Sequence, residues 1–566
     1  MQDRWILPPC ENLNGGAIAW NEICGSECIA RLLFRKGFKS PDDVQSFLRP
    51  RLSSLTDPFL LPQMHAAVAR ILTALDSHER IVLFGDYDVD GVTSLALLAE
   101  LLRAYGATPE LFLPLRMEEG YGLSRESVER CLEQYRPQLL IAIDCGTTSA
   151  GEIAKLKTRG VDVIVLDHHE PKSQLPDCVA IVNPKADSAS PFHYLCSVGI
   201  VFKLCHALLK ARPLPGFDLK SKLDLVALGT VADIVPLVEE NRVLVQRGAI
   251  EIGRTSRVGL RKLMQVAGVR LPILPDDIGY RLGPRLNAAG RLSTAEKSLR
   301  LLLTNDEDEA AALATELDQQ NRTRQGVEKE ILAAAILTIE KQFDAARDAA
   351  IVAGARGWHP GVLGIVASRI ARKYHRPAIV IGFDENGAGK GSGRSIQGLN
   401  LVDALNRCAA TLEKFGGHEM AAGVALHEKN FSKFAEMFCN TARELLSNEA
   451  LQRSLRLDHE LAFTSIDVEF LRWHELLQPF GNGNPQPLFF ARGVEPVGAP
   501  RVSNEKHLIF RLRQGRRHRR AVYFDSAANQ LPPAPWDIAF RIGLDEYDGE
   551  TLVSMRIEGL RAAEQA

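Results

Sequence analysis

Short apolar runs, each followed at once by polar or acidic residues, recur between about residues 55 and 240. The clearest runs are 81–84, 139–143 and 163–166, and amphipathic stretches such as 92–102 lie between them. Apolar runs that alternate with helical patterns are typical of a parallel sheet covered by helices. Ligands of such open sheets bind beyond the carboxyl ends of the strands, so we expect these strand ends to meet at one site.

The length and charge of the chain limit the classes of protein that it can form. At roughly 100–200 residues per domain, the 566 residues predict several separate cores. The composition, 46% hydrophobic and 24% charged, is that of an ordinary globular protein and excludes a mostly disordered chain. A formal net charge of -2 gives no overall attraction to nucleic acid or membrane, so any site for a polyanion must be local.

The cysteines and the beginning of the chain bear on the compartment. Ten cysteines are scattered without the paired spacing of a disulfide framework or a zinc site, which favours reduced thiols. The opening residues lack the apolar core of a signal peptide, and no apolar run is long enough for a membrane span. We therefore expect a cytoplasmic protein.

Beyond the first α/β block, the pattern changes twice. A proline-free run from a capping-box-like segment, 304–307, predicts one long helix or a helix pair, which either connects two blocks or packs within a core. A smaller α/β block follows, with apolar runs at 350–353 and 378–382 and two glycine-rich turns. The last block has short β-like runs that suggest an OB-type barrel; these are 455–457, 488–490, 507–512, 521–524 and 538–542.

The expected fold class is therefore multidomain α/β with a terminal β-barrel. The expected divisions are a lead segment (1–54), a parallel-sheet domain (55–303), a connecting helix (304–345), a smaller α/β domain (346–452) and an OB-like domain (453–566).

The densest chemical signal is the segment 84–91, in which Asp86, Asp88 and Asp90 alternate directly after an apolar run. Alternation places their carboxylates on one side of an extended chain. A calcium-binding EF-hand loop is excluded, because its twelfth position is Leu97 instead of glutamate and a strand precedes it. Three solvated turn aspartates are the simpler alternative, but further ligands at other strand ends argue against them.

Acidic residues and histidines follow the next strands. Asp144 ends one predicted strand, and Asp167, His168 and His169 end another. Carboxylates with imidazole suit manganese or magnesium better than zinc. Asp233 stands in an apolar run, where an unpaired charge is costly, and so requires a cation.

Together these motifs resemble the DHH phosphoesterase superfamily and, within it, the bacterial RecJ single-strand exonucleases. The matching segments are DYDVDG at 86–91, IDCGTTS around Asp144, the DHH triplet at 167–169, ADIVPL at 232–237 and GPRLNAAGR at 283–291. The segment GGHEMAAG, with Gly416, Gly417 and His418, is similar to the associated DHHA1 domain. The resemblance covers the chain from about residue 50 to its end and includes the family's OB domain.

The resemblance implies a phosphodiesterase with two metal ions, Mn²⁺ or Mg²⁺. The implied ligands are Asp88, Asp90, Asp144, His168 and Asp233. Asp86 and His169 are the implied catalytic residues, with Asp86 beside the metals and His169 hydrogen-bonded to the phosphate. One departure stands out: small phosphatases of the superfamily carry a histidine where this chain has Phe84, and Asp86 can fill that vacancy.

The resemblance also implies phosphate-binding residues outside the metal centre. Arg116, Ser392 and Arg394 are expected to cup a 5′-terminal phosphate. Arg285, Asn287, Arg291 and His418, with Gly416 and Gly417, are expected near the scissile or neighbouring phosphates. Glycine-rich turns with solvent-facing arginines are the alternative interpretation.

The barrel segment carries a pronounced basic cluster. Its arginines are Arg511, Arg513, Arg516, Arg517, Arg519 and Arg520. Charge runs are usually solvated loops, but arginines beside aromatic residues in an OB-like barrel can track a single strand without reading its sequence. We favour contact with DNA.

The function implied by the resemblance is a single-stranded-DNA exonuclease running 5′ to 3′, which releases 5′-mononucleotides in recombination and repair. The family expectation includes a single-strand-binding protein as partner, and we expect a monomer. One alternative is a hydrolase of short oligonucleotides or cyclic dinucleotides, although these need no extended strand track. Another is a non-catalytic replication scaffold, against which the retained carboxylates argue, since without a cation they would repel one another.

Overall fold

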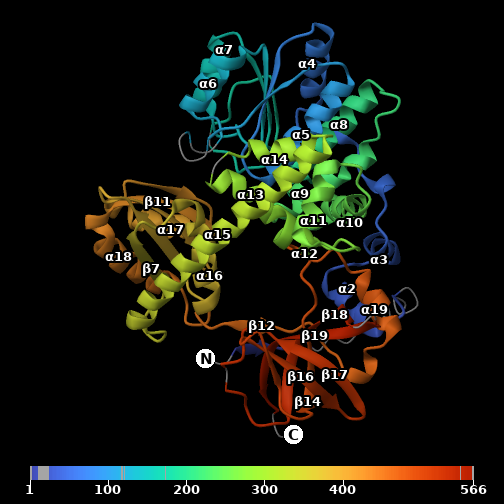
Figure 1. The fold of residues 1–566 in the computed structure, drawn as a ribbon, viewed down its shortest axis with the longest axis vertical. Helices are drawn as coiled ribbons and strands as arrows, with labels where there is room; N and C mark the ends of the chain where they lie inside the picture. Colours follow the sequence, from blue (N-terminus) through green and yellow to red (C-terminus); the bar gives the residue numbers. More distant parts are fainter. Residues whose placement is uncertain are drawn as a thin grey trace. The chain divides into compact units, whose positions relative to one another are not determined.

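The computed structural model describes residues 3–9, 24–115, 119, 122–172, 174–292, 294–528, 530–547 and 550–563 (Figure 1). The chain separates into two compact units. The larger unit contains Leu52–Leu451 and Gly481–Asn484, and the smaller contains Met1–Arg51, Gln452–Phe480 and Pro485–Ala566. Among the helices described, none has the length and apolar character needed to cross a membrane.

The larger unit opens with the parallel sheet that the sequence predicts. In order across the sheet, its strands are β3 (Glu110–Phe112), β2 (Ile81–Phe84), β4 (Leu139–Ile143), β5 (Asp162–Leu166) and β6 (Ala180–Val182). Every residue of β2 and β4 is buried, because helices cover both faces of the sheet, and such strands form unbroken apolar runs. Because β2, β4 and β5 are neighbours, their carboxyl ends lie side by side.

Helices cover the two faces of this sheet in two layers. The helices of this part are α4 (Met64–Asp76), α5 (Val89–Ala104), α6 (Arg125–Tyr135), α7 (Ala150–Thr158), α8 (Ser197–Ala211), α9 (Leu223–Ala232), α10 (Glu239–Gly253), α11 (Val258–Ala267), α12 (Pro275–Asp277), α13 (Gly283–Leu292) and α14 (Glu296–Leu303). On one face α6 and α7 pack, and on the other lie α4, α5 and α8 (Figure 1).

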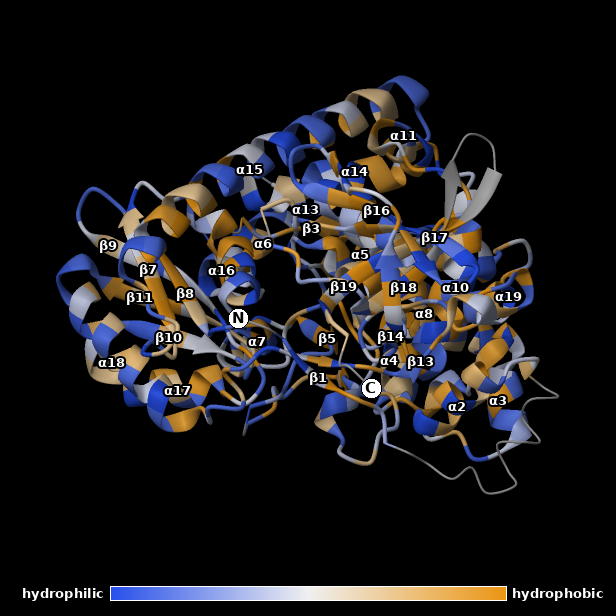
Figure 2. Cartoon of the chain, turned by 90° about the horizontal axis from the view of Figure 1, so that it is seen from below, coloured by the Kyte–Doolittle hydropathy of each residue, from blue (hydrophilic) through white to orange (hydrophobic). Residues whose placement is uncertain are grey.

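A single helix, α15 (Glu307–Gln342), follows, so the prediction resolves to one helix instead of a pair. Its first half packs in the core of the parallel-sheet part through residues such as Leu313, and its second half packs in another core through residues such as Ile331. The helix therefore connects the two α/β parts and also packs in the core of each. It carries hydrophilic and hydrophobic residues along its length (Figure 2).

The predicted capping box at 304–307 is wrong in its details. The N-cap of α15 is Asp306, whose side chain accepts the N–H groups of Asp308 and Glu309. Asp306 directly precedes the first helical residue, so its carboxylate reaches the free N–H groups of the first turn, where a negative charge is also favourable.

The rest of the larger unit is a second α/β part. Its sheet runs β10 (Lys414–Gly417), β11 (Ala421–His427), β9 (Ala388–Arg394), β8 (Ala378–Phe383) and β7 (Ile351–Arg356), with helices α16 (Pro360–Tyr374), α17 (Leu401–Arg407) and α18 (Phe431–Leu445). The central strand β8 is wholly buried and shows as hydrophobic in Figure 2.

Of the two glycine-rich segments predicted as turns in this part, the one at 391–395 lies mainly in a strand, whereas the one at 416–423 forms the turn between β10 and β11. Gly391 lies inside β9, and Gly416 and Gly417 end β10. A Cβ on Gly391 would lie 2.7 Å from Ile381 Cγ1 and 2.8 Å from Val424 Cγ2. Glycine is therefore required there by close packing between neighbouring strands, not by a turn.

The smaller unit contains a closed, OB-like barrel. The strands of its sheet are β13 (His459–Glu460), β14 (Phe489–Pro496), β15 (Arg501–Ser503), β16 (His507–Gln514), β17 (Arg517–Tyr523), β18 (Trp536–Tyr547) and β19 (Glu550–Ala562). Because β14 pairs with both β18 and β16, the strands β14, β18, β19, β17 and β16 form a closed ring.

Two expectations about the barrel are corrected. The run 455–457 is not a barrel strand: β12 (Ser454–Arg456) pairs in parallel with β1 (Arg4–Ile6) in a separate sheet. The long strand β19, which completes the ring, was not predicted.

Helices from the beginning of the chain pack in the smaller unit. Its helices α2 (Glu27–Arg35) and α3 (Pro41–Leu48), with α19 (Val468–Glu475), share a core with the barrel strands. Buried residues such as Ile29 and Val44 lie in the same core as Phe489, so these helices and the barrel stabilise each other.

His474 of α19 makes the stability of this unit pH-dependent. Its side chain is 1% exposed, it packs against the rings of Phe480 and Phe489, and its ring nitrogens accept or donate no hydrogen bond within the described part of the chain. The carboxylate of Glu475 lies 4.0 Å from Nδ1. Burial lowers the pKa of His474 to about 4.

Since the unfolded chain binds this proton near pH ~6.5, acid favours unfolding. Between about pH 6.5 and 4, the free energy of unfolding should fall by roughly 1.4 kcal/mol per pH unit through this group. His474→Phe should remove that slope, measured by urea unfolding at pH 7 and pH 5 with tryptophan fluorescence. His518→Phe, at an exposed position, is the control. Parallel pH profiles for parent and His474→Phe would contradict this account.

Candidate metal centre and phosphate-binding residues

The loop between β2 and α5 carries the alternating aspartates. Asp88 is the N-cap of α5, and its Oδ1 accepts the N–H groups of Asp90 (3.0 Å) and Gly91 (3.2 Å). A Cβ at Gly91 would lie 2.4 Å from the carbonyl oxygen of Asp86, so only glycine lets the chain turn this tightly. The turn brings Asp86, Asp88 and Asp90 to the carboxyl end of β2.

The beginning of α8 orients two of the carboxylates. Asp90 is buried, and its two oxygens accept the N–H groups of Ser197 (2.7 Å) and Val198 (2.8 Å). The hydroxyl of Ser197 donates to Asp144 Oδ1 at 2.8 Å. Asp144 itself has a positive φ of 64°, a conformation that aspartate tolerates better than most residues. Ser197 was not predicted, because nothing local in the sequence marks its partner.

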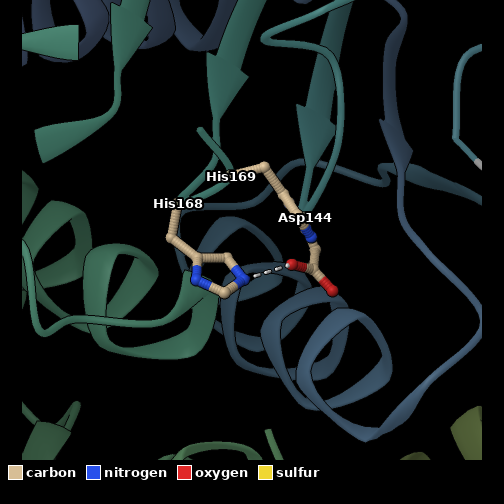
Figure 3. A group of neighbouring side chains, drawn as sticks. All are labelled: Asp144, His168 and His169. Carbon is tan, nitrogen blue, oxygen red and sulfur yellow. Dashed lines mark ion pairs between the residues drawn. The ribbon is translucent and has the colours of Figure 1, made fainter. Parts of the chain in front are cut away.

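Three carboxylates surround one imidazole nitrogen. His168 Nε2 lies 3.3 Å from Asp144 Oδ1, and Figure 3 shows the ring directed at that carboxylate. Asp233 Oδ2 is 3.6 Å and Asp90 Oδ2 is 3.9 Å from the same nitrogen. This buried nitrogen has no hydrogen-bond partner in the described part of the chain.

Asp167 organises the histidine segment. One of its oxygens accepts the N–H groups of His168 and His169 and lies 2.7 Å from the ring Nδ1 of His169, and the other accepts the N–H of Thr147. Asn183, which no local sequence pattern marks, donates to Thr147 Oγ1 and to the carbonyl of His169. Asp167 thus orients the backbone of His168 and the ring of His169.

The electrostatics of the cluster suit a cation. Burial and mutual repulsion raise the pKa of Asp90 to about 7 and hold the pKa values of Asp144 and Asp233 well above the usual range. Burial, with the nearby charges of His169 and His418, lowers the pKa of His168 to about 3. His168 is therefore neutral, as a metal ligand must be, and a cation would relieve the repulsion between the carboxylates.

The ligand atoms form three overlapping groups. They are Asp86, Asp88 and Asp144; Asp90, His168 and Asp233; and Asp144, His168 and His169, in each of which the atoms lie within 4.8 Å of one another. Shared members link the groups, so the cluster offers ligands to more than one ion. An oxygen-rich set with imidazole fits Mn²⁺ or Mg²⁺.

The predicted residues of α13 make contacts within the protein. Arg285 forms an ion pair with Asp318 of α15 at 2.9 Å. Asn287 Oδ1 accepts the N–H of Val89 at 3.1 Å, which supports the aspartate loop. Arg291 donates to the carbonyl of Gly361 at 3.2 Å. Contact of these three residues with phosphate stays a prediction.

Ser392 and Arg394 of β9 lie close to the beginning of α16. A Cβ on Gly364 would lie 3.0 Å from Arg394 Nη2 and 3.6 Å from the Ser392 hydroxyl. Burial lowers the pKa of Arg394, and no described carboxylate forms an ion pair with it. A half-buried guanidinium beside the positive end of a helix favours an anion there.

Other predicted residues have less defined surroundings. Arg116 lies outside the described residues. Gly416, Gly417 and His418 are exposed, and the N–H of His418 donates to the carbonyl of Ala421 in a tight turn. Because the charge of His418 lowers the pKa of His168, this turn lies within electrostatic reach of the metal cluster.

The basic cluster of the smaller unit lies on the hairpin of β16 and β17. Arg511 pairs with Arg520 across the hairpin, and Arg516 lies in its turn. The exposed members are Arg511, Arg513, Arg516, Arg517 and Arg520. Arg513 is paired with Glu495, whereas the half-buried Arg519 donates to the carbonyls of Phe463 (3.0 Å) and Ile466 (2.6 Å). Arg519 therefore supports the fold.

The parallel sheet with a carboxylate and histidine cluster at its strand ends defines a metal-dependent phosphoesterase of the DHH class. The model of the DHH family N-terminal domain matches residues 80–230, that of the DHHA1 domain matches 347–444, and that of the RecJ OB domain matches 457–559.

Relatives and solved structures narrow the class. The single-stranded-DNA-specific exonuclease RecJ of Bacillus subtilis is 35% identical over 95% of this chain and 68% of that protein. The enzyme of Haemophilus influenzae is also 35% identical, over 90% of this chain and 92% of its own. The crystal structure of RecJ from Thermus thermophilus with Mn²⁺ matches with a TM-score of 0.84 and 32% identity, over 99% of this chain and 80% of that chain. The Mg²⁺ complex matches with a TM-score of 0.79 and 29% identity, over 99% and 79%. The chain belongs to the RecJ family of single-stranded-DNA-specific exonucleases.

Proposed function

We propose that this chain hydrolyses single-stranded DNA from its 5′ end and releases 5′-mononucleotides. The observation that carries the proposal is a carboxylate and histidine cluster that could hold metal ions, in the same compact unit as Arg394, a half-buried arginine that could bind an anion. A pocket for a terminal phosphate, together with a cleavage centre, restricts hydrolysis to strand ends. Residues 55–303 form the catalytic domain of this proposal, 346–452 the domain that holds the end, and 453–566 the strand-binding domain.

When bound, two divalent cations, Mn²⁺ or Mg²⁺, would lower the pKa of the attacking water and neutralise negative charge on the scissile phosphate. The residues that would hold them are Asp88, Asp90, Asp144, His168 and Asp233, with Asp86 beside them. Although burial opposes the charged form, the hydrogen bond with Asp167 raises the pKa of His169. When its Nδ1–H donates to the carboxylate of Asp167, His169 can present Nε2–H to a phosphate oxygen.

The proposed end pocket consists of Ser392 and Arg394 with Arg116. Arg394→Ala should reduce turnover of 5′-phosphorylated strands roughly tenfold to a hundredfold more than turnover of 5′-hydroxyl strands, because charge-assisted hydrogen bonds to the phosphate are lost. Arg407→Ala, an exposed arginine of the same part of the unit that pairs with Glu444, is the matched control. Initial rates on the two substrates measure this difference. An equal loss of turnover on both would exclude contact between Arg394 and the 5′-terminal phosphate.

The two alternative functions have less support. The closed barrel with its exposed arginines suits a long strand better than a dinucleotide. The complete carboxylate cluster suits an enzyme better than a scaffold.

We infer further, from the family, that the protein acts as a cytoplasmic monomer in DNA repair and recombination, with single-strand-binding protein as a partner. Gel filtration of the chain alone and with that protein tests the last two points. A stable dimer, or independent elution of the two proteins at micromolar concentration, would contradict them.

A further inference from the structure

The position of the Asp233 carboxylate in the metal cluster depends on the conformation of the backbone around it. Asp90 and Asp144 are oriented by hydrogen bonds from the beginning of α8, whereas the carboxylate of Asp233 accepts no hydrogen bond from the residues described. Its side chain is 22% exposed and lies 3.6 Å from His168 Nε2. Asp233 is the C-cap of α9, so the path of the chain at 233–234 decides where its carboxylate stands.

That path is strained. Ile234, the next residue, has a φ of 61°, in the left-handed region. Helices commonly end with a residue in this conformation, but it is usually glycine, and a β-branched residue there is an outlier. Strain of this kind persists only where the surrounding structure holds it.

The segment Gly481–Asn484, which is distant in the sequence, forms hydrogen bonds with both ends of the turn at 234–237. Asn482 Nδ2 donates to the carbonyl of Ile234 at 2.8 Å, and the N–H of Leu237 donates to the carbonyl of Asn482 at 2.7 Å. A bridge between Gly481 and Asn484 closes the segment into a tight turn. One asparagine thus binds both ends of the 234–237 turn.

The glycines of the segment allow its close approach. A Cβ on Gly481 would lie 2.7 Å from Leu237 Cδ1. Gly483 has a φ of 71°, and a Cβ there would lie 3.0 Å from both Pro236 Cβ and Val238 Cγ1. These four residues belong to the larger unit although the chain on either side of them belongs to the smaller.

We propose that Gly481–Asn484 is a clasp that positions the metal centre: it holds Ile234 in its left-handed conformation and so sets the place of the Asp233 carboxylate. Asn482 is a positioning residue, because it acts on the centre through the backbone of Ile234. This inference rests on the metal centre of the proposed function.

The test is Mn²⁺ binding to the full chain, measured by the electron paramagnetic resonance signal of free Mn²⁺. Asn482→Ala should weaken Mn²⁺ affinity about tenfold, a loss usual for residues that orient ligands. It should also lower kcat while leaving KM for single-stranded DNA unchanged. Asn386→Ala, an exposed asparagine in the β8–β9 turn, is the control and should bind Mn²⁺ as the parent does.

A second variant separates positioning from a merely structural contact. Glycine adopts the left-handed conformation without strain, so Ile234→Gly should make the clasp dispensable. In the Ile234→Gly variant, adding Asn482→Ala should lower Mn²⁺ affinity by less than about twofold, compared with about tenfold in the parent. Parent-like Mn²⁺ affinity of Asn482→Ala alone would overturn the proposal, as would an equal loss in both backgrounds. A parent chain that binds no Mn²⁺ would instead contradict the metal centre itself.

Discussion

Asp144→Ala should abolish hydrolysis of single-stranded DNA while the chain stays folded and still binds the strand. Asp144 belongs to two of the three ligand groups, so its loss disrupts more than one ion position. Charge stabilisation by metal ions is worth several kcal/mol, so kcat should fall at least about a thousandfold. Single-turnover hydrolysis at saturating Mn²⁺ measures the loss, and fluorescence anisotropy measures strand binding.

Asp144→Asn is the matched control for shape. Asparagine tolerates the positive φ of this position and can still accept the hydrogen bond from Ser197. Its turnover should be nearly as low, because the charge is lost. Without metal its Tm should exceed that of the parent, since one of several mutually repelling carboxylates is gone. Parent-like turnover of either variant would remove Asp144 from the metal centre.

Neutralising the exposed arginines of the barrel hairpin should flatten the salt dependence of strand binding. The variant replaces Arg511, Arg516, Arg517 and Arg520 with glutamine. Each lost phosphate contact should lower the log-log slope by ~0.7. Very short oligonucleotides should still be cleaved, because the metal centre lies in the other unit, whereas long strands should lose affinity and processivity.

Two other arginines of the same hairpin are not expected to contact the strand. Arg513→Gln is the matched control, because Arg513 already pairs with Glu495 and its loss should change the slope less. Arg519 is left intact, because it binds the carbonyls of Phe463 and Ile466 and its replacement would disturb the fold. Titrations at several salt concentrations that give an unchanged slope would exclude the hairpin from the strand-binding surface.

The sequence predicted best what is encoded locally. The strands β2, β4 and β5 are buried on both faces, so their apolar runs are visible in the sequence, and the acidic residues directly after them meet because parallel strands end at one edge. The roles of individual ligands and the domain limits stay predictions.

What depends on distant contacts could not be predicted. The pairing of Trp5 with Leu455 joins segments at opposite ends of the chain and leaves no local signal. Gly391 is a strand residue because of its neighbours Ile381 and Val424, although glycine-rich sequence alone indicates a turn. Likewise, nothing in the turn-like segment Gly481–Asn484 indicates that it binds the loop after Asp233.

Digestion of one single strand labelled at either its 5′ or its 3′ end, with Mn²⁺ and with a chelator, tests both the metal dependence and the direction of hydrolysis. We expect that the 5′ label is released at once as a mononucleotide, that the 3′-labelled strand shortens progressively, and that the chelator stops both. Early release of the 3′ label, or hydrolysis that continues in the chelator, would contradict a metal-dependent 5′ to 3′ exonuclease.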